Sequence, residues 1–183
     1  KQPVDFSSVL VPLKNVVDIV RTFESCDEDI TVTISEHQIS FTSGGLYVTS
    51  RLINGTFPDY RQIIPKDHTT EAVMLKSDLI QALRLSNVFS GKFNQITFTL
   101  DPSEKICSLA SKNSDVGEQK TVVSGVMKGN KIEVLVNYRY LSEVLNSIGS
   151  DSISVECTEV NRPIVVKGVG ESHFLYLMMP MNK

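Results

Sequence analysis

The sequence predicts an α+β fold in which a βαβββ unit is repeated, with paired helices on one side of antiparallel sheets. Three short amphipathic helix patterns each follow a short apolar strand pattern and precede further strand patterns. The order recurs at a nearly constant spacing: 64 residues separate Val11 from Leu75, and 61 separate Leu75 from Val136, the ends of the strands that lead into the helices. Because one helix cannot cover a sheet alone, we expect two units to pack side by side.

The first unit begins with a short apolar strand at residues 9–11, followed by Pro12, which suits the first turn of a helix. The helix pattern places apolar residues on one face, at Leu13, Val16, Val17, Val20 and Phe23. Strand patterns follow at residues 30–35, 38–42 and 46–53, with a turn at Ser43-Gly44-Gly45 between the last two. No second unit accompanies this one, so we expect its packing partner to lie upstream of Lys1 and the chain to be a fragment.

The second and third units repeat this order. A strand at residues 72–75 precedes a helix that Ser77 is expected to cap, and the expected buried stripe is Leu79, Ile80, Leu83 and Val88. Its strands are predicted at residues 95–100, 106–111 and 119–127. A strand at residues 131–136 then precedes a helix capped by Asn137, with Leu141, Val144, Leu145 and Ile148 buried. Strands at residues 152–157, 164–167 and 173–179 complete one expected domain at residues 67–183, after a half-domain with a linker at residues 1–66.

Composition narrows the classes of function. The chain has 183 residues and a net charge of -3, which argues against an indiscriminate nucleic-acid binder. Its three cysteines are far apart without a metal-binding spacing, no apolar run approaches the roughly 20 residues that cross a bilayer, and no signal peptide opens the chain. We therefore expect a cytoplasmic protein without a membrane partner. His37, His68 and His173 lack the spacing of a metal site, so neither a metal nor another cofactor is expected, and we predict no enzymatic activity.

The stretch at residues 50–65 is unusual because it is apolar but cannot form a regular element. Phe57, Tyr60 and Ile63 are large and apolar, while Pro58 and Pro65 forbid a regular helix or central strand between them. A linker between domains and the wall of a binding groove are both compatible with this composition.

Three motifs carry a resemblance to a known family. Residues 50–61 read SRLINGTFPDYR, residues 136–141 read VNYRYL and residues 176–181 read YLMMPM. In this order they resemble the bacterial DNA polymerase III β subunit family, the sliding clamps. The resemblance covers the second half of that family's middle domain and its whole C-terminal domain. It implies the DNA-clamp fold, in which three such domains per chain and two chains per homodimer close a ring around duplex DNA, helices inside and sheets outside.

The resemblance also implies a function, that of a DNA polymerase processivity factor. Clamp-binding peptides of the DNA polymerase III α subunit, the clamp loader and repair proteins would dock in a groove between the linker and the last residues. The groove residues carried over by motif are Pro58, Gln62, Ile63, Asn137, Tyr140, Pro163, Leu177, Met179, Pro180 and Met181. The family usually has basic residues where this chain has Gln62 and Asn182, so an altered peptide preference is expected. Methionine suits a pocket that accepts several partners.

Basic residues of the predicted helices are the candidates for facing encircled DNA. A ring needs only weak, salt-sensitive attraction to phosphates, without sequence-specific contacts. The candidates are Lys14, Arg21, Lys76, Arg84 and Arg139. An alternative from another class is a peptide-binding adaptor that uses the same groove without DNA.

Overall fold

The computed structural model describes residues 8–182. The chain divides into two compact units between Asp59 and Tyr60. The sequence-based boundary lies later, after Lys66, because it groups the linker with the first domain. In the structure the residues after Asp59 belong to the second unit, where they line pockets described below.

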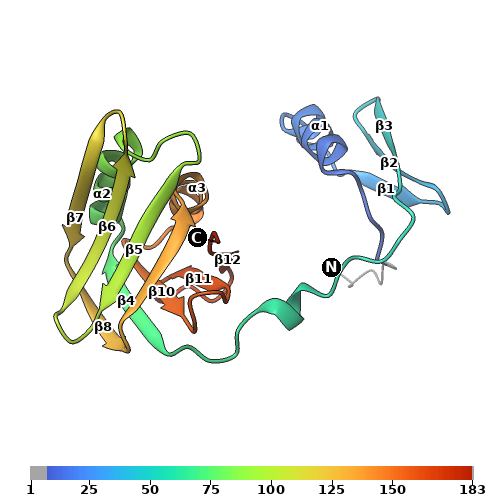
Figure 1. Ribbon diagram of the computed structural model, residues 1–183. Helices are drawn as coiled ribbons and strands as arrows, with labels where there is room; N and C mark the ends of the chain where they lie inside the picture. Colours follow the sequence, from blue (N-terminus) through green and yellow to red (C-terminus); the bar gives the residue numbers. More distant parts are fainter. Residues whose placement is uncertain (1–7, 183) are drawn as a thin grey trace. The chain divides into compact units, whose positions relative to one another are not determined.

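The first unit contains one helix and a three-stranded antiparallel sheet with the order β1-β2-β3 (Figure 1). Its elements are α1 (Leu13–Phe23), β1 (Thr31–Ile34), β2 (Gln38–Ser43) and β3 (Leu46–Arg51). The helix packs on the sheet through Phe23, whose ring centroid lies 6.4 Å from that of Phe41. The strand predicted at residues 9–11 is wrong, since among these residues only Leu10 pairs, in an isolated bridge with Ile53. Gly44 and Gly45 have φ values of 54° and 81°, which is the backbone that a two-residue hairpin turn needs.

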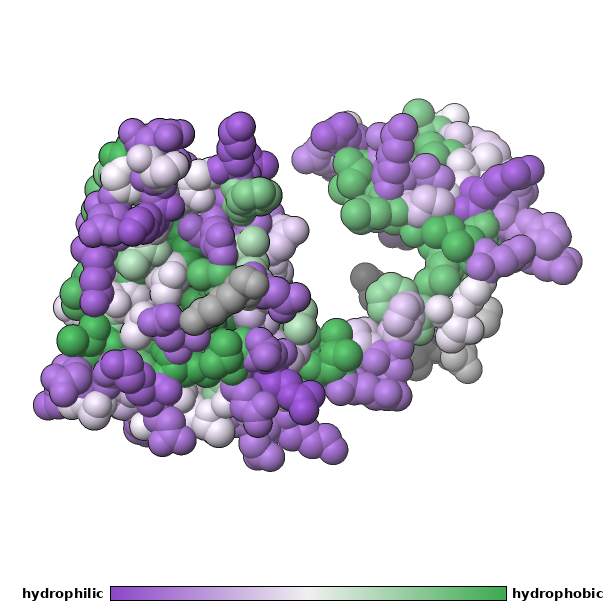
Figure 2. Space-filling model, in the orientation of Figure 1, coloured by the Kyte–Doolittle hydropathy of each residue, from purple (hydrophilic) through white to green (hydrophobic). Residues whose placement is uncertain are grey.

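The apolar stripe of α1 is only partly buried. The side chains that face the sheet are Ile19 and Phe23, whereas four residues of the predicted stripe remain exposed. Figure 2 shows this hydrophobic surface over α1. The exposed residues are Leu13, Val16, Val17 and Val20.

The second unit contains two helices and two antiparallel sheets (Figure 1). It opens with the short 3-10 helix η1 (Tyr60–Ile63). The remaining elements are β4 (Thr70–Leu75), α2 (Lys76–Val88), β5 (Gln95–Asp101), β6 (Ile106–Asn113), β7 (Gly117–Val123), β8 (Gly125–Gly129), β9 (Ile132–Asn137), α3 (Tyr138–Ser147), β10 (Ser152–Cys157), β11 (Ile164–Gly168) and β12 (Tyr176–Met178).

The two repeats of this unit exchange their first strands. The five-stranded sheet has the order β12-β11-β10-β4-β8, and the four-stranded sheet has the order β7-β6-β5-β9. Strand β4, which leads into α2, thus pairs with β10 of the following repeat. Strand β9, which leads into α3, pairs with β5 of the preceding repeat and is the orange strand beside β5 in Figure 1. The predicted side-by-side packing is therefore interlocked rather than a simple contact of two sheets.

The single strand predicted at residues 119–127 is wrong. The segment breaks at Ser124, so that β7 joins the four-stranded sheet and β8 pairs with β4 in the five-stranded sheet. Side chains alternate between the two faces in the same way in β7 and β8, so the position of the break depends on which strand pairs with each half.

The helix starts show one confirmed and one wrong cap. Asn137 caps α3 as predicted, because its Oδ1 accepts a hydrogen bond of 2.9 Å from the backbone N–H of Arg139. Ser77 does not cap α2, which begins at Lys76; the N–H of Lys76 instead donates to the carbonyl of Asp151 at 2.8 Å. The two helices bury their apolar stripes in one core with both sheets.

In the second unit the predicted buried stripes agree with the structure except at one residue. In α3 the buried residues are those expected, and in α2 Leu79 and Leu83 are fully buried while Ile80 packs partly buried on the core. Val88 is 62% exposed, because the buried face of α2 runs through Ala82 and Ser86 instead.

Candidate functional site

Two adjoining pockets lie where η1 and the segment after it meet the last strand of the second unit. They share Ile63, Ile64 and Leu177. The smaller has a volume of about 400 Å³ and the larger about 700 Å³. We call the two together the groove. The smaller pocket is lined by Tyr60, Ile63, Ile64, Ser172, His173, Phe174, Leu175 and Leu177. The larger is lined by residues 62–67, Thr158, Glu159, Asn161, Arg162, Pro163, Leu177 and Met179.

Strand alternation places the floor of the groove on the outer face of the five-stranded sheet. Met178 is 3% exposed and belongs to the core, whereas Met179 is 60% exposed. Leu177 points to the same side as Met179. It stands opposite Val165 of β11, and Val165 stands opposite Glu156 of β10. Leu177 and Met179 therefore line the groove, while Met178 holds the strand to the core.

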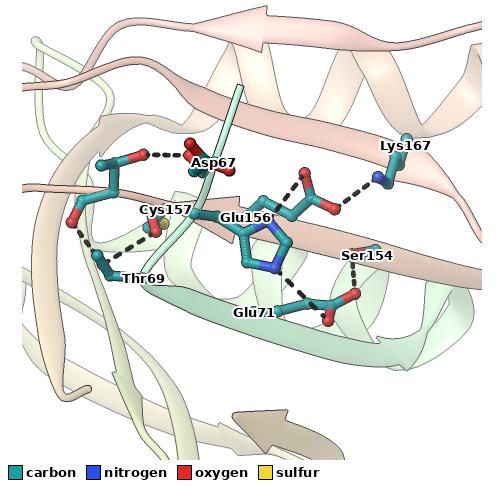
Figure 3. A network of polar contacts seen from close by, with 9 residues as sticks. Asp67, Thr69, Glu71, Ser154, Glu156, Cys157 and Lys167 are labelled. Carbon is teal, nitrogen blue, oxygen red and sulfur yellow. Dashed lines mark hydrogen bonds and ion pairs between the residues drawn. The ribbon is translucent and has the colours of Figure 1, made fainter. Parts of the chain in front are cut away.

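The wall of the groove is fixed to the sheet by hydrogen bonds just after it. The N–H of Thr69 donates to the carbonyl of Cys157 at 3.0 Å, and the hydroxyl of Thr158 donates to the carbonyl of Asp67 at 3.0 Å (Figure 3). Ile63 remains 59% exposed, so it offers apolar surface to a ligand. The wall thus combines an anchored backbone with accessible apolar side chains.

Five of the ten predicted groove residues line these pockets. They are Gln62, Ile63, Pro163, Leu177 and Met179.

The other five are placed elsewhere. Pro58 belongs to the first unit. Asn137 is occupied in the cap of α3, and Tyr140 on that helix is 53% exposed. Pro180 is half-buried outside both pockets, and the N–H of Met181 donates to the carbonyl of Leu135 at 2.7 Å, which ties the terminal segment to β9.

Tyr140 lies near the inward side of β12. Burial raises the pKa of the Tyr176 hydroxyl above its usual value, and the Glu143 carboxylate and Tyr140 shift it in the same direction. Tyr176 is partly buried against the core, on the side of β12 opposite Leu177. Tyr140 is therefore close to the helix-facing side of this edge strand.

Sequence reasoning missed several lining residues because they lie in irregular segments. Ile64 follows no periodic pattern. Phe174 and Leu175 lie in the first part of the strand predicted at residues 173–179, which is wrong because β12 begins only at Tyr176. Only their position beside motif residues could have indicated these three. A further cavity of about 660 Å³ lies over the four-stranded sheet. Its lining includes Thr97, Ala110 and Lys120, which are paired across three strands, and none of them belongs to a motif.

Four of the five candidate DNA-facing residues are exposed on their helices: Lys14, Arg21, Arg84 and Arg139. Arg84 and Arg139 lie opposite the buried stripes of α2 and α3. Lys76 differs, because its ammonium donates a hydrogen bond of 2.8 Å to the carbonyl of Ile148 at the C-terminal end of α3. A cation at the C-terminal end of a helix is electrostatically favourable, and this hydrogen bond joins the start of α2 to the end of α3.

Residues 8–182 contain no group of three or more His, Cys, Asp or Glu side chains that could hold a metal ion. No helix in this part of the chain is long and apolar enough to cross a membrane.

Comparisons with known proteins agree with the arrangement of the two units. A family model described as the DNA polymerase III beta subunit, central domain, matches residues 1–59, and one described as the C-terminal domain of that subunit matches residues 61–182. The beta sliding clamp of Synechococcus elongatus is 29% identical over 178 residues, and that of Escherichia coli K12 is 28% identical over 179 residues. Each alignment covers 96% of this chain and 48% of the relative.

Solved structures show the same fold. A DNA polymerase sliding clamp from Pseudomonas aeruginosa superposes with a TM-score of 0.87 at 25% identity, covering 98% of this chain and 49% of that structure. The pol III beta of Caulobacter crescentus gives a TM-score of 0.88 at 24% identity, covering 98% and 48%. The chain thus spans about half the length of the relatives it matches. Because the two family models together match residues 1–59 and 61–182, the chain belongs to the DNA polymerase III beta subunit family.

Proposed function

We propose that this chain is part of a ring-shaped sliding clamp, a processivity factor that encircles duplex DNA and tethers DNA polymerase and other partners through the groove. The observation that carries the proposal is the pair of adjoining pockets that share Leu177 at the last strand of the unit. Such a site is suited to binding and holds no catalytic constellation, so the proposed role is mechanical and not enzymatic. The proposed location is the cytoplasm.

The groove fits an extended peptide with two apolar side chains. Each pocket accepts one side chain, and Leu177 lies between them. Gln62 and Arg162 offer polar groups at the larger pocket, which suits a peptide whose backbone needs hydrogen-bonding partners. The proposed partners are the DNA polymerase III α subunit, the clamp loader and repair proteins.

The helices of the second unit support a weak contact with DNA. Arg84 and Arg139 are exposed, and a net charge of -3 over the whole chain is compatible with a ring that holds DNA by closure. Attraction between a few guanidinium groups and phosphates is screened by salt, which permits sliding.

Ring closure as a homodimer is supported by an apolar surface beside a free strand edge. Among the strands of residues 8–182, β7 pairs only with β6. The adjacent α2 is joined to β7 by the hydroxyl of Ser86, which donates to Gln119 at 3.2 Å. Around the end of α2 the side chains of Leu85, Val88 and Phe93 are 54%, 62% and 76% exposed. A free edge with apolar neighbours is suited to pairing with another chain.

The test uses the complete gene product loaded onto nicked circular DNA. A topological ring is retained on the circle at salt concentrations that weaken charge attraction and is released when the circle is cut. Retention that depends on salt but not on cutting would contradict the ring and indicate ordinary electrostatic binding. Peptide binding without any retention would favour the adaptor.

Charge reversal tests the DNA-facing helices separately. The double variant Arg84→Glu and Arg139→Glu is expected to weaken retention without changing peptide affinity. Lys112→Glu is the control, because this lysine is exposed and lies on strand β6 and not on a helix. Equal losses in both proteins would contradict the assignment.

A further inference from the structure

A cluster of charged side chains surrounds His68 on the face of the five-stranded sheet that carries the groove. Figure 3 shows Glu71, Glu156 and Lys167 of this cluster. The Nε2 atom of His68 lies 3.9 Å from Oε2 of Glu71, and its Nδ1 atom lies 3.7 Å from Oε2 of Glu156. Both ring nitrogens therefore face carboxylates. Glu71 also accepts a hydrogen bond of 2.9 Å from the hydroxyl of Ser154.

The charge of this cluster changes with the protonation of His68. Lys167 on β11 pairs with Oε1 of Glu156 at 2.5 Å, and Lys128 stands opposite Glu71 in the pairing of β4 with β8. Lys128 is exposed, so the partly buried charges that face the imidazole are two carboxylates and the Lys167 ammonium. In its own segment Lys66 and Asp67 precede the histidine. A protonated imidazole is attracted to both carboxylates, whereas the neutral ring loses this attraction.

His68 lies where the groove wall joins the sheet. Asp67, its neighbour, lines the larger pocket, and its carbonyl accepts the hydrogen bond from Thr158, which lines the same pocket. Thr69, the neighbour on the other side, is bonded to Cys157. The wall at residues 62–67 is thus connected to the sheet through the segment that His68 occupies, and His68 itself is not among the lining residues.

We propose that His68 is a positioning residue whose protonation holds the groove wall against β10, so that the groove binds apolar peptides more tightly at pH 6 than at pH 8. The inference rests on the proposed peptide-binding function of the groove. It adds a regulation of that site by a residue that does not touch the peptide. The side chains of Glu71 and Glu156 are 27% and 12% exposed, which limits the screening of their attraction by water.

The binding test uses a capped hexapeptide with tryptophan at its N-terminus, leucine and phenylalanine separated by one serine, and no titratable side chain. Its fluorescence reports binding because the chain contains no tryptophan. Wild-type protein is expected to bind about threefold more tightly at pH 6 than at pH 8, the size of one partly exposed ion pair. His68→Gln is expected to bind the peptide with the same affinity at pH 6 and at pH 8. His37→Gln in the first unit is the matched control that keeps the wild-type ratio.

A second measurement separates this inference from the proposed function. Amide hydrogen exchange at residues 62–69, corrected for the intrinsic effect of pH, is expected to be more protected at pH 6 than at pH 8 in wild type and unchanged with pH in His68→Gln. Protection that changes without any peptide binding would refute the proposed function and retain the positioning role. Protection or affinity in wild type that does not depend on pH, or a ratio that survives in His68→Gln, would overturn the inference.

Discussion

The alternation of β12 predicts that two neighbouring residues have separate roles. Met178 is 3% exposed and packs in the core, whereas Leu177 lines both pockets of the groove on the opposite face. Met178→Ala removes a buried side chain and is expected to cost about 3 kcal/mol of unfolding free energy, within the usual range for such truncations. With a urea dependence of about 1.5 kcal/mol per molar, the unfolding midpoint falls by about 2 M.

Leu177→Ala is expected to act on binding instead. Its side chain is half-buried, so the truncation costs about 1 kcal/mol of stability. Loss of the apolar surface shared by the two pockets is expected to weaken binding of the hexapeptide about tenfold, which corresponds to about 1.4 kcal/mol of binding free energy.

Stability is measured in urea by hydrogen exchange of β10, since Ile153 in that strand is fully buried within the second unit. Affinity is measured by tryptophan fluorescence of the peptide in the absence of urea. The assignment of faces is refuted if Leu177→Ala binds the peptide like wild type, or if Met178→Ala leaves the midpoint unchanged and abolishes binding.

Three further predictions concern the stability and reactivity of the second unit. Gly170→Ala, at a φ of 81° with open space around it, should lower the free energy of unfolding by about 1 kcal/mol. Gly129→Ala should lower it by about 3 kcal/mol, because its Cβ would collide with the Thr69 carbonyl. The urea unfolding midpoints of the two variants compare these effects, and equal shifts would exclude the collision. Hydrogen bonds, first of all the one from Lys131, hold the pKa of Asp101 far below its usual value. The stabilisation that this carboxylate provides is therefore complete above about pH 4 and is lost as the pH falls. The difference in urea midpoint between wild type and Asp101→Asn should shrink from pH 5 to pH 2. Burial raises the pKa of both Cys107 and Cys157 to about 12, so at pH 8 a thiol reagent should modify them only after unfolding, and rapid labelling of either in the native protein would contradict their burial.

Periodic segments of the fold could be predicted from the sequence because their side chains alternate between core and solvent. The strand at residues 152–157 has the predicted bounds, and the cap at Asn137 is confirmed. Ser77 failed because a carbonyl from a distant loop, that of Asp151, meets the first N–H of α2 and removes the need for a cap. The prediction of one strand at residues 119–127 failed because the break at Ser124 depends on which strands lie beside the segment, and a single sequence does not contain that information.

The candidate site shows the same division between regular and irregular segments. Leu177 and Met179 follow from the motif at the last strand, and the two pockets include both. Phe174 was expected in the strand at residues 173–179, but β12 begins only at Tyr176, so Phe174 lies in a loop and its position depends on the folded path of the chain. Lys76 was assigned to DNA as one of the basic residues expected on the surface of the helices, but a helix end of another repeat provides a partner for its ammonium. Both cases depend on contacts between distant segments: Lys76 and Ile148 are separated by 72 residues, and Phe174 lines a pocket together with Ile63.

The exchange of first strands between the two repeats has a consequence for folding during synthesis. Strand β4 is made early, but one of its two partner strands is the distant β10, where Glu71 stands opposite Glu156. Such distant pairing is slow to form, and until β10 leaves the ribosome β4 has only β8 as a strand neighbour. The last strand to pair, β12, carries Leu177. The groove is therefore completed after the rest of the unit, so that an unfinished chain has no complete groove.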